Sequence, residues 1–326
     1  MTDWNALYRR LSQETPSLEL RRDEPMSRHT TFRVGGSVPL MALPKNEDEA
    51  QQVLSVAALE FGVRPFFMGK GSNLLVSDRG VDLLVMKADG LSRLELLEET
   101  EWPLLPSSRT ITAGSGVSLA RLANFALEHG LTGLEFAQGI PGSVGGGVYM
   151  NAGAYGGEMS QVVSSVRSVS LPPEDWVREC RDPGFSYRHS LFQEQDDFIL
   201  GACFSLKPGD PAEIKAKMDD LAARRKEKQP LEYPSAGSTF KRPAPVDGQP
   251  VYAAALIEGC GLKGFTVGGA QVSEKHAGFV INRGGASCGD IVRLMAQVRE
   301  RVLRETGITL EPEVRYLGKE GEGWNF

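Results

Sequence analysis

The pattern of apolar and polar positions predicts two helices with clear ends in the first half of the chain. Between Asn46 and Gly62, apolar residues recur at helical spacing. Asn46 is a good N-cap, and Gly62 can take the left-handed conformation that ends a helix. The segment between Ser118 and Gly130 repeats this arrangement. We therefore expect helices over 47–61 and 119–129.

Short apolar or alternating runs around these helices predict strands. The run at 65–78 is interrupted by a Gly-Lys-Gly-Ser-Asn sequence, which indicates a strand, a polar loop and a second strand. The other expected strands are at 37–44, 83–89, 111–117, 162–171 and 198–206.

The composition changes after residue 210, where we expect a domain boundary. Residues 211–230 form a charged segment that predicts a helix ended by Pro230. Beyond it we expect a strand-rich region at 264–282, a long helix from about 290 to 306, and a closing strand at 308–318.

Residues 139–158 hold eight glycines in twenty positions, a composition that suits neither a helix nor an ordinary strand. Glycine is favoured where the backbone must take positive φ or approach a bulky group closely. Because successive backbone amides can bind an anion, a diphosphate-bearing cofactor is the natural ligand, although a set of tight turns would also explain the glycines.

Composition and charge exclude several classes of protein. The 326 residues carry a formal net charge of -6, which gives no basic surface for nucleic acid or for an anionic membrane. The four cysteines are far apart and favour neither a zinc site nor a disulfide framework. The N-terminal segment lacks the apolar stretch of a secretory signal peptide. No run of eighteen apolar residues, the length needed for a transmembrane helix, occurs in the sequence. We expect a cytoplasmic protein that acts on small molecules and binds no metal.

Common nucleotide and hydrolase motifs are missing from the sequence. Gly69-Lys70 is not a Walker A loop, because Arg64 stands where that loop needs glycine. Neither 114–116 nor 139–157 fits the GxGxxG pattern, and no HExxH or GxSxG occurs. Any dinucleotide must therefore be held by something other than a Rossmann unit.

Polar residues in three separate segments suit proton chemistry beside a carbonyl. An Arg fork can bind a carboxylate or enolate, a Ser hydroxyl can deliver a proton, and a carboxylic acid can share one. Taken singly, each is also explained as a surface or turn residue. The residues are Tyr187 and Arg188, Ser238 and Lys241, and Glu313 and Arg315.

Seven blocks, in order, resemble the flavin-dependent UDP-N-acetylenolpyruvoylglucosamine reductases (UDP-N-acetylmuramate dehydrogenases) of bacterial peptidoglycan synthesis. The resemblance spans almost the whole chain. The blocks are HTTFRVGG (29–36), MGKGSNLLVSD (68–78), GIPGSVGGGVYMNAGAYGGE (139–158), FSYRHS (185–190), PSAGSTFKRP (234–243), GGAQVSEKHAGFVIN (268–282) and LEPEVR (310–315).

The resemblance implies an α+β fold with an FAD-binding module of the vanillyl-alcohol-oxidase type. This module would cover 1–208, in subdomains of about 1–75 and 76–208. A C-terminal α/β substrate-binding domain would follow at 209–310, and residues 311–326 would close the active site. We expect a monomer, although no motif in the sequence decides the oligomeric state.

The resemblance implies non-covalent FAD held mainly by backbone amides, and NADPH as the hydride donor. NADPH would reduce FAD, leave, and be replaced by UDP-N-acetylglucosamine enolpyruvate, whose methylene carbon accepts the hydride from N5 of the flavin. The cofactor-binding residues carried over are Arg33, Gly35, Gly69, Gly71, Ser72, Asn73, Gly139, Gly142, Ser143 and Gly146.

By the same resemblance, Ser238 would protonate the carbon next to the substrate carboxylate, and Arg188 and Glu313 would stabilise the developing enolate. Tyr187, Lys228 and Lys241 would contact the diphosphate and uridine. The chain departs from the family pattern at Arg242, where Asn is usual. It also lacks the inserted tyrosine-bearing lid, and so resembles the shorter type.

Two other functions remain open at this stage. One is a flavoprotein oxidase of the same fold class, in which His29 would be the available tether for a covalent flavin. The other is a sugar-nucleotide-binding protein without catalytic activity. The presence of Arg188, Ser238 and Glu313 together argues against the second.

Overall fold

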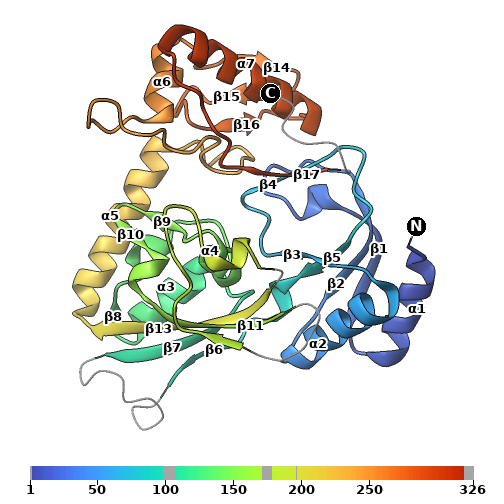
Figure 1. Cartoon of the computed structure of the whole chain (residues 1–326). Helices are drawn as coiled ribbons and strands as arrows, with labels where there is room; N and C mark the ends of the chain where they lie inside the picture. Colours follow the sequence, from blue (N-terminus) through green and yellow to red (C-terminus); the bar gives the residue numbers. More distant parts are fainter. Residues whose placement is uncertain (1, 98–107, 171–177, 196, 319–326) are drawn as a thin grey trace. The chain divides into compact units, whose positions relative to one another are not determined.

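The computed structural model describes residues 2–97, 108–170, 178–195 and 197–318 (Figure 1). It divides into two compact units. The first comprises Met1–Arg22, Leu40–Lys70 and Leu83–Arg224, and the second comprises Asp23–Pro39, Gly71–Asp82 and Arg225–Phe326. The domain limits expected at 208 and 310 stay predictions.

The first unit contains a sheet of order β1-β2-β5-β3, whose first two strands continue into the second unit. β2 and β3 both pair in parallel with β5. Leu7, Leu40 and Leu54 are fully buried in one core, which joins the sheet to the helices beside it (Figure 1). The elements are α1 (Trp4–Glu14), β1 (Glu19–Pro25), β2 (Ser37–Leu43), α2 (Glu47–Ser55), the π-helical turn η2 (Val56–Glu60), β3 (Phe66–Met68) and β5 (Leu84–Lys87).

A second, antiparallel sheet in the first unit has the order β12-β11-β13-β7-β6, with β8 pairing the end of β13. Alternate residues of β13, such as Ala202 and Phe204, are buried against α3 and α4. The elements are β6 (Leu94–Leu96), β7 (Arg109–Gly114), α3 (Leu119–Glu128), β8 (Leu131–Thr132), α4 (Val144–Tyr149), β11 (Val163–Val169), β12 (Arg178–Cys180) and β13 (Phe198–Pro208).

The second unit is built around the long helix α7, which packs on a three-stranded antiparallel sheet (Figure 1). Ile291, Leu294 and Val298 lie on the buried face of α7. A parallel pair, β4 with β17, joins two segments that are distant in sequence. The elements are β4 (Leu74–Val76), α6 (Ala253–Gly259), β14 (Thr266–Val267), β15 (Ala270–Val272), β16 (Val280–Asn282), α7 (Cys288–Thr306) and β17 (Arg315–Leu317).

The charged helix α5 runs from Pro211 to Lys228 and passes from the first unit into the second. The remaining short elements are η1 (Met26–Arg28), η3 (Ala88–Gly90), η4 (Glu135–Ala137), β9 (Gly153–Ala154), β10 (Gly157–Glu158), η5 (Met159–Gln161) and η6 (Leu191–Gln193).

Side-chain caps fix the helix starts, as the sequence predicts. Asn46 accepts a hydrogen bond from the Glu49 amide at 2.8 Å, and Ser118 accepts one from the Arg121 amide at 3.2 Å. The long helix α7 begins two residues before the expected position, because Ser287 and Asp290 form a capping box there.

The expectation that no helix forms within the glycine-rich segment 139–158 is wrong, because α4 lies inside it. Val144 and Val148 are one turn apart and fully buried. Gly147 packs so closely that a Cβ there would lie 2.7 Å from the Met159 methyl carbon. Burial and close packing therefore offset the low helical propensity of glycine. No helix of the described residues is long and apolar enough to cross a membrane.

Candidate functional site

In the first unit, the segment around 115–118 is paired with the start of the glycine-rich segment. Ser118 and Ser143 form an antiparallel bridge. The amide of Gly145 donates to the carbonyl of Ser115 at 2.9 Å, and Leu119 donates to the carbonyl of Gly142 at 3.1 Å. These backbone hydrogen bonds hold the two loops against each other.

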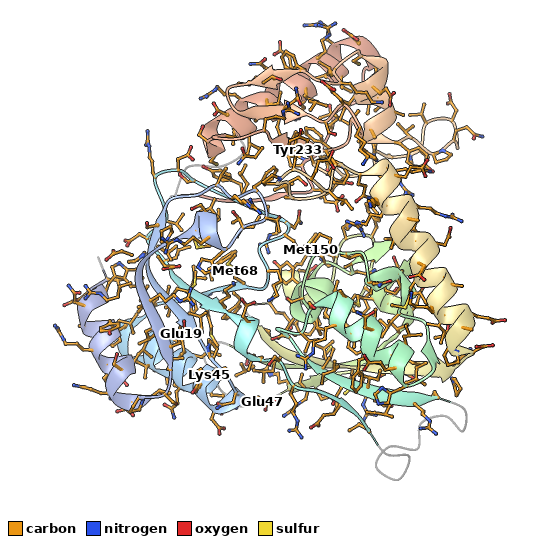
Figure 2. The ribbon with its side chains drawn as sticks, turned by 180° about the vertical axis from the view of Figure 1, so that it is seen from behind. Glu19, Lys45, Glu47, Met68, Met150 and Tyr233 are labelled. Atoms are coloured by element: carbon orange, nitrogen blue, oxygen red, sulfur yellow. The ribbon has the colours of Figure 1, made fainter. Side chains whose placement is uncertain are left out.

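Gly69 belongs to the same cluster of loops. It follows β3, whose last residue, Met68, is labelled in Figure 2. A Cβ at Gly69 would lie 2.3 Å from Oγ of Ser143, so the site admits only glycine unless Ser143 moves. Of the predicted cofactor residues, the first unit thus brings Gly69, Gly142 and Ser143 together, with Gly139 and Gly146 in the same glycine-rich segment.

Three buried side-chain oxygens in these loops have no hydrogen-bond partner among the described residues. They are Oγ of Ser115, Oε1 of Gln138 and Oγ of Ser143. Buried polar groups in native proteins are nearly always hydrogen-bonded, and five further side-chain atoms among the described residues share this exception. The hydroxyls of Ser115 and Ser143 can donate to anionic oxygens, so they fit a diphosphate-bearing cofactor such as FAD, whereas Oε1 of Gln138 only accepts.

The second unit holds the other predicted cofactor residues, in the segments around 31–36 and 71–73. The amide of Thr31 donates to the carbonyl of Gly71 at 3.2 Å. Gly35 has φ of 122°, and a Cβ there would lie 2.8 Å from Cβ of Val76. Arg33 is exposed and has a left-handed φ of 57°. Ser72 is half-buried in the same loop as Gly71.

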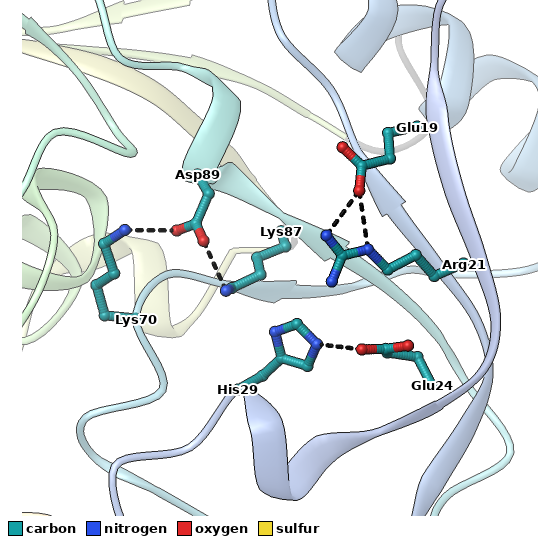
Figure 3. A network of polar contacts seen from close by, with 7 residues as sticks. All are labelled: Glu19, Arg21, Glu24, His29, Lys70, Lys87 and Asp89. Carbon is teal, nitrogen blue, oxygen red and sulfur yellow. Dashed lines mark hydrogen bonds and ion pairs between the residues drawn. The ribbon is translucent and has the colours of Figure 1, made fainter.

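A lysine–aspartate network lies beside Gly69 in the first unit (Figure 3). Asp89 contacts Nζ of Lys87 at 2.6 Å and Nζ of Lys70 at 3.0 Å. Burial by itself would raise the pKa of Asp89, but the hydrogen bonds from Lys87 and Lys70 outweigh it and the pKa lies below its usual value. The trio therefore keeps one net positive charge next to the Gly69 turn.

His29 lies in the second unit and is engaged with a carboxylate. Its Nε2 lies 2.8 Å from Oε1 of Glu24, and both side chains are buried (Figure 3). Nε2 of the imidazole is thus engaged in an internal contact.

Arg188 lies in the first unit and is held against the later part of the glycine-rich segment. Its Nη2 donates to the carbonyl of Gly153 at 3.3 Å, and its backbone has a left-handed φ of 57°. Gln193 supports this turn by donating from Nε2 to the carbonyl of Arg188 at 2.9 Å and to that of Tyr149 at 2.8 Å. Asn151 donates to the carbonyl of Ser186 at 3.0 Å.

Ser238 and Glu313 lie in the second unit on two segments that pair with one another. The amide of Glu313 donates to the carbonyl of Thr239 at 2.9 Å, and the amide of Lys241 donates to the carbonyl of Glu311 at 2.8 Å. Ser238 is exposed and Glu313 is half-buried. The pairing brings two of the three predicted catalytic residues to one place, although they are far apart in sequence.

The predicted substrate-binding residues are exposed. Tyr187 is 52% exposed and stacks with the guanidinium of Arg188 at 5.3 Å. Lys228 is the last residue of α5, and Nζ of Lys241 lies 3.6 Å from Glu311. Arg242, which stands at the usual Asn position, lies over the ring of Tyr252 at 5.0 Å.

Several residues of the site were not predicted from the sequence: Ser115, Gln138, Lys87, Asp89, Asn151 and Gln193. The polar pair Lys87 and Asp89 directly after a buried strand was a usable signal. The others have no local signature. No group of three or more His, Cys, Asp or Glu suited to a metal occurs within the described ranges, and all four cysteines are free thiols.

Two family models match the chain. An FAD binding domain matches residues 38–176, and the C-terminal domain of UDP-N-acetylenolpyruvoylglucosamine reductase matches residues 229–317. The reductase of Caldanaerobacter subterraneus subsp. tengcongensis is 44% identical over 92% of this chain and 94% of its own length. The reductase of Agathobacter rectalis is 45% identical over 95% and 97%.

The chain belongs to the UDP-N-acetylenolpyruvoylglucosamine reductase family. It is a flavin-dependent oxidoreductase, and its cofactor is FAD. A solved structure of the family, from Thermus caldophilus, has a TM-score of 0.74 and 31% identity, and the match covers 92% of this chain and 99% of that one. The predicted α+β fold, with an FAD-binding module and a C-terminal domain, is thereby confirmed.

Proposed function

We propose that this reductase converts UDP-N-acetylglucosamine enolpyruvate to UDP-N-acetylmuramate, with NADPH as the reductant. The observation that carries the proposal is the pairing of the Ser238 and Glu313 segments in a member of this family. It brings together the two chain segments that carry the hydroxyl and the carboxyl group, and a positioned hydroxyl can deliver a proton next to a carboxylate.

FAD would be held by the loops around Gly69, Ser115 and Ser143 in the first unit. The hydroxyls of Ser115 and Ser143 support this assignment, because they can donate to anionic oxygens. The cofactor roles expected of Arg33 and Gly71, in the second unit, stay predictions. When bound, FAD would supply the hydride chemistry between NADPH and the substrate.

The roles of the chain's own residues follow from their chemistry. Arg188 would bind the substrate carboxylate through its planar fork, and its turn is held by Gln193 and Gly153. Ser238 would give its proton to the carbon beside that carboxylate. Glu313 would stabilise the enol form that precedes protonation. Loss of one stabilising donor of this kind typically costs ~10²–10³ in rate.

Tyr187, Lys228 and Lys241 would bind the diphosphate and uridine, since they offer cations and an exposed ring. NADPH and the sugar nucleotide would use one site in turn, which accounts for a nicotinamide user without a Rossmann fingerprint. We place the reaction in peptidoglycan synthesis in the cytoplasm, by a protein that works as a monomer.

The proposal is tested by the product formed in D₂O. We expect the vinylic methylene signals of the substrate to disappear from the NMR spectrum and solvent deuterium to appear at the carbon next to the carboxylate, because the Ser238 hydroxyl exchanges with solvent. NADPH must be consumed in equal amount. Product without solvent deuterium at that carbon would remove an exchangeable side chain as the proton donor, and an unchanged substrate would exclude the reaction.

A further inference from the structure

Asn73 is one of the residues expected to bind FAD, but in the structure its side chain contacts the predicted catalytic segment. Its Nδ2 donates to the main-chain carbonyl of Glu313 at 3.1 Å. The main-chain carbonyl of Asn73 accepts from the amide of Arg315 at 3.0 Å. Both contacts lie within the second unit.

These contacts continue into a parallel pairing of strands. Leu74 stands opposite Arg315, and Val76 stands opposite Leu317. Glu313 lies two residues before Arg315, the first paired residue, where the regular ladder has not begun. The side-chain amide of Asn73 therefore replaces the backbone hydrogen bond that would come next in the ladder. It holds Glu313 although this residue lies outside the paired strands.

The other side of Glu313 is fixed as well. Its amide donates to the carbonyl of Thr239 at 2.9 Å, and Thr239 is in turn held by the amide of Val280, which donates to its Oγ1 at 2.9 Å. The amide and the carbonyl of Glu313 thus each have a fixed partner. Because the partners of these two groups restrain the backbone dihedrals of Glu313, they also restrain the direction of its Cα–Cβ bond, from which the carboxyl group extends.

We infer that Asn73 is a positioning residue for Glu313. This inference rests on the proposed function of Glu313. The Asn73 side chain is committed to the catalytic segment, while its backbone belongs to the loop expected to hold FAD. The residue thereby ties the cofactor loop to the carboxyl group that serves the substrate. Loss of the Asn73 side-chain amide should then slow substrate reduction strongly and change FAD affinity little.

The experiment uses the FAD-loaded enzyme with Asn73→Ala and Asn73→Asp. The two half-reactions are followed separately by flavin absorbance, and FAD affinity and thermal unfolding are measured beside them. For both variants at neutral pH we expect reoxidation by the enolpyruvyl substrate to fall by about tenfold, the scale of one lost hydrogen bond. Reduction by NADPH and FAD affinity should stay within about twofold.

The Asn73→Asp variant adds a pH signature. Its ionised carboxylate cannot donate to the Glu313 carbonyl, whereas the protonated form can. We therefore expect its reoxidation rate to recover, relative to wild type at the same pH, as the pH falls through the pKa of the new carboxyl group. A merely structural role would give no such recovery.

Gln271→Ala is the matched control, because Gln271 also donates from a side-chain amide to a main-chain carbonyl of the second unit, that of Gly264, at 3.2 Å. It should leave both half-reactions unchanged. Equal losses in both half-reactions, or wild-type reoxidation in Asn73→Ala, would overturn the inference. Failure of the proposed function would look different, because the wild-type enzyme itself would then not be reoxidised by the substrate.

Discussion

Ser238→Ala should slow reoxidation of the reduced enzyme by the enolpyruvyl sugar nucleotide by ~10²–10⁴, the usual contribution of a positioned general acid. The hydroxyl is the proton source in our account, and alanine removes it without adding bulk. Ser238 is exposed and lies next to the buried Thr239, so the fold should tolerate the change. Stopped-flow absorbance of the flavin measures the rate directly.

The same preparation supplies the internal controls for Ser238→Ala. Bound flavin and its reduction by NADPH should match wild type, because Ser238 serves only the second half-reaction. Ser235→Ala, in the same segment, should behave as wild type throughout. Reoxidation of Ser238→Ala at an unchanged rate would remove Ser238 as the proton donor and leave that role to another group.

Gly116→Ala should destabilise the protein by about 3 kcal/mol and release its flavin. A Cβ at Gly116 would lie 2.0 Å from the carbonyl oxygen of Ala88 and 2.9 Å from its carbonyl carbon. Both atoms are main chain, so relief requires a backbone shift, at the upper end of the usual cost of overpacking. The shift would reach Ser115, whose carbonyl accepts from Gly145 in the cofactor loops.

Urea unfolding and the flavin absorbance retained after gel filtration measure the two effects of Gly116→Ala. Gly259→Ala is the control, because Gly259 lies in α6 and a Cβ there meets nothing within 4 Å. It should change stability by less than about 1 kcal/mol and leave flavin binding intact. A Gly116→Ala protein as stable and as yellow as wild type would contradict the packing described for these loops.

Local signals predicted the helices well where the caps were explicit. Asn46 and Ser118 cap the expected helices, and Gly62 and Gly130 take positive φ just beyond them. In these cases the side chain that satisfies the first amides is adjacent in sequence, so the helix start can be read from the sequence.

Elements determined by distant contacts could not be predicted. β1 (Glu19–Pro25) consists mostly of charged residues and has little apolar pattern, so only its sheet neighbours define it. The helix α6 has only seven residues and no side-chain N-cap. The helix α4 contradicts glycine propensity, because its close packing against Met159 and Leu119 decides the outcome.

For the candidate site, too, some features can be predicted from the sequence and others only from the fold. Arg188, Ser238 and Glu313 stand out in the sequence only as polar residues that suit proton chemistry, and the family resemblance gives them their separate roles. The structure pairs the segments of Ser238 and Glu313, and their catalytic roles stay predictions. The link from Asn73 to Glu313 spans 240 positions, and only the fold could reveal it.

The central claim, two half-reactions through one bound flavin, is tested most directly by the visible spectrum of the purified enzyme under anaerobic conditions. We expect flavin bands that bleach when NADPH is added and return when the enolpyruvyl sugar nucleotide follows. A protein that cannot be loaded with FAD, or one that bleaches and is not reoxidised by that substrate, would contradict the account.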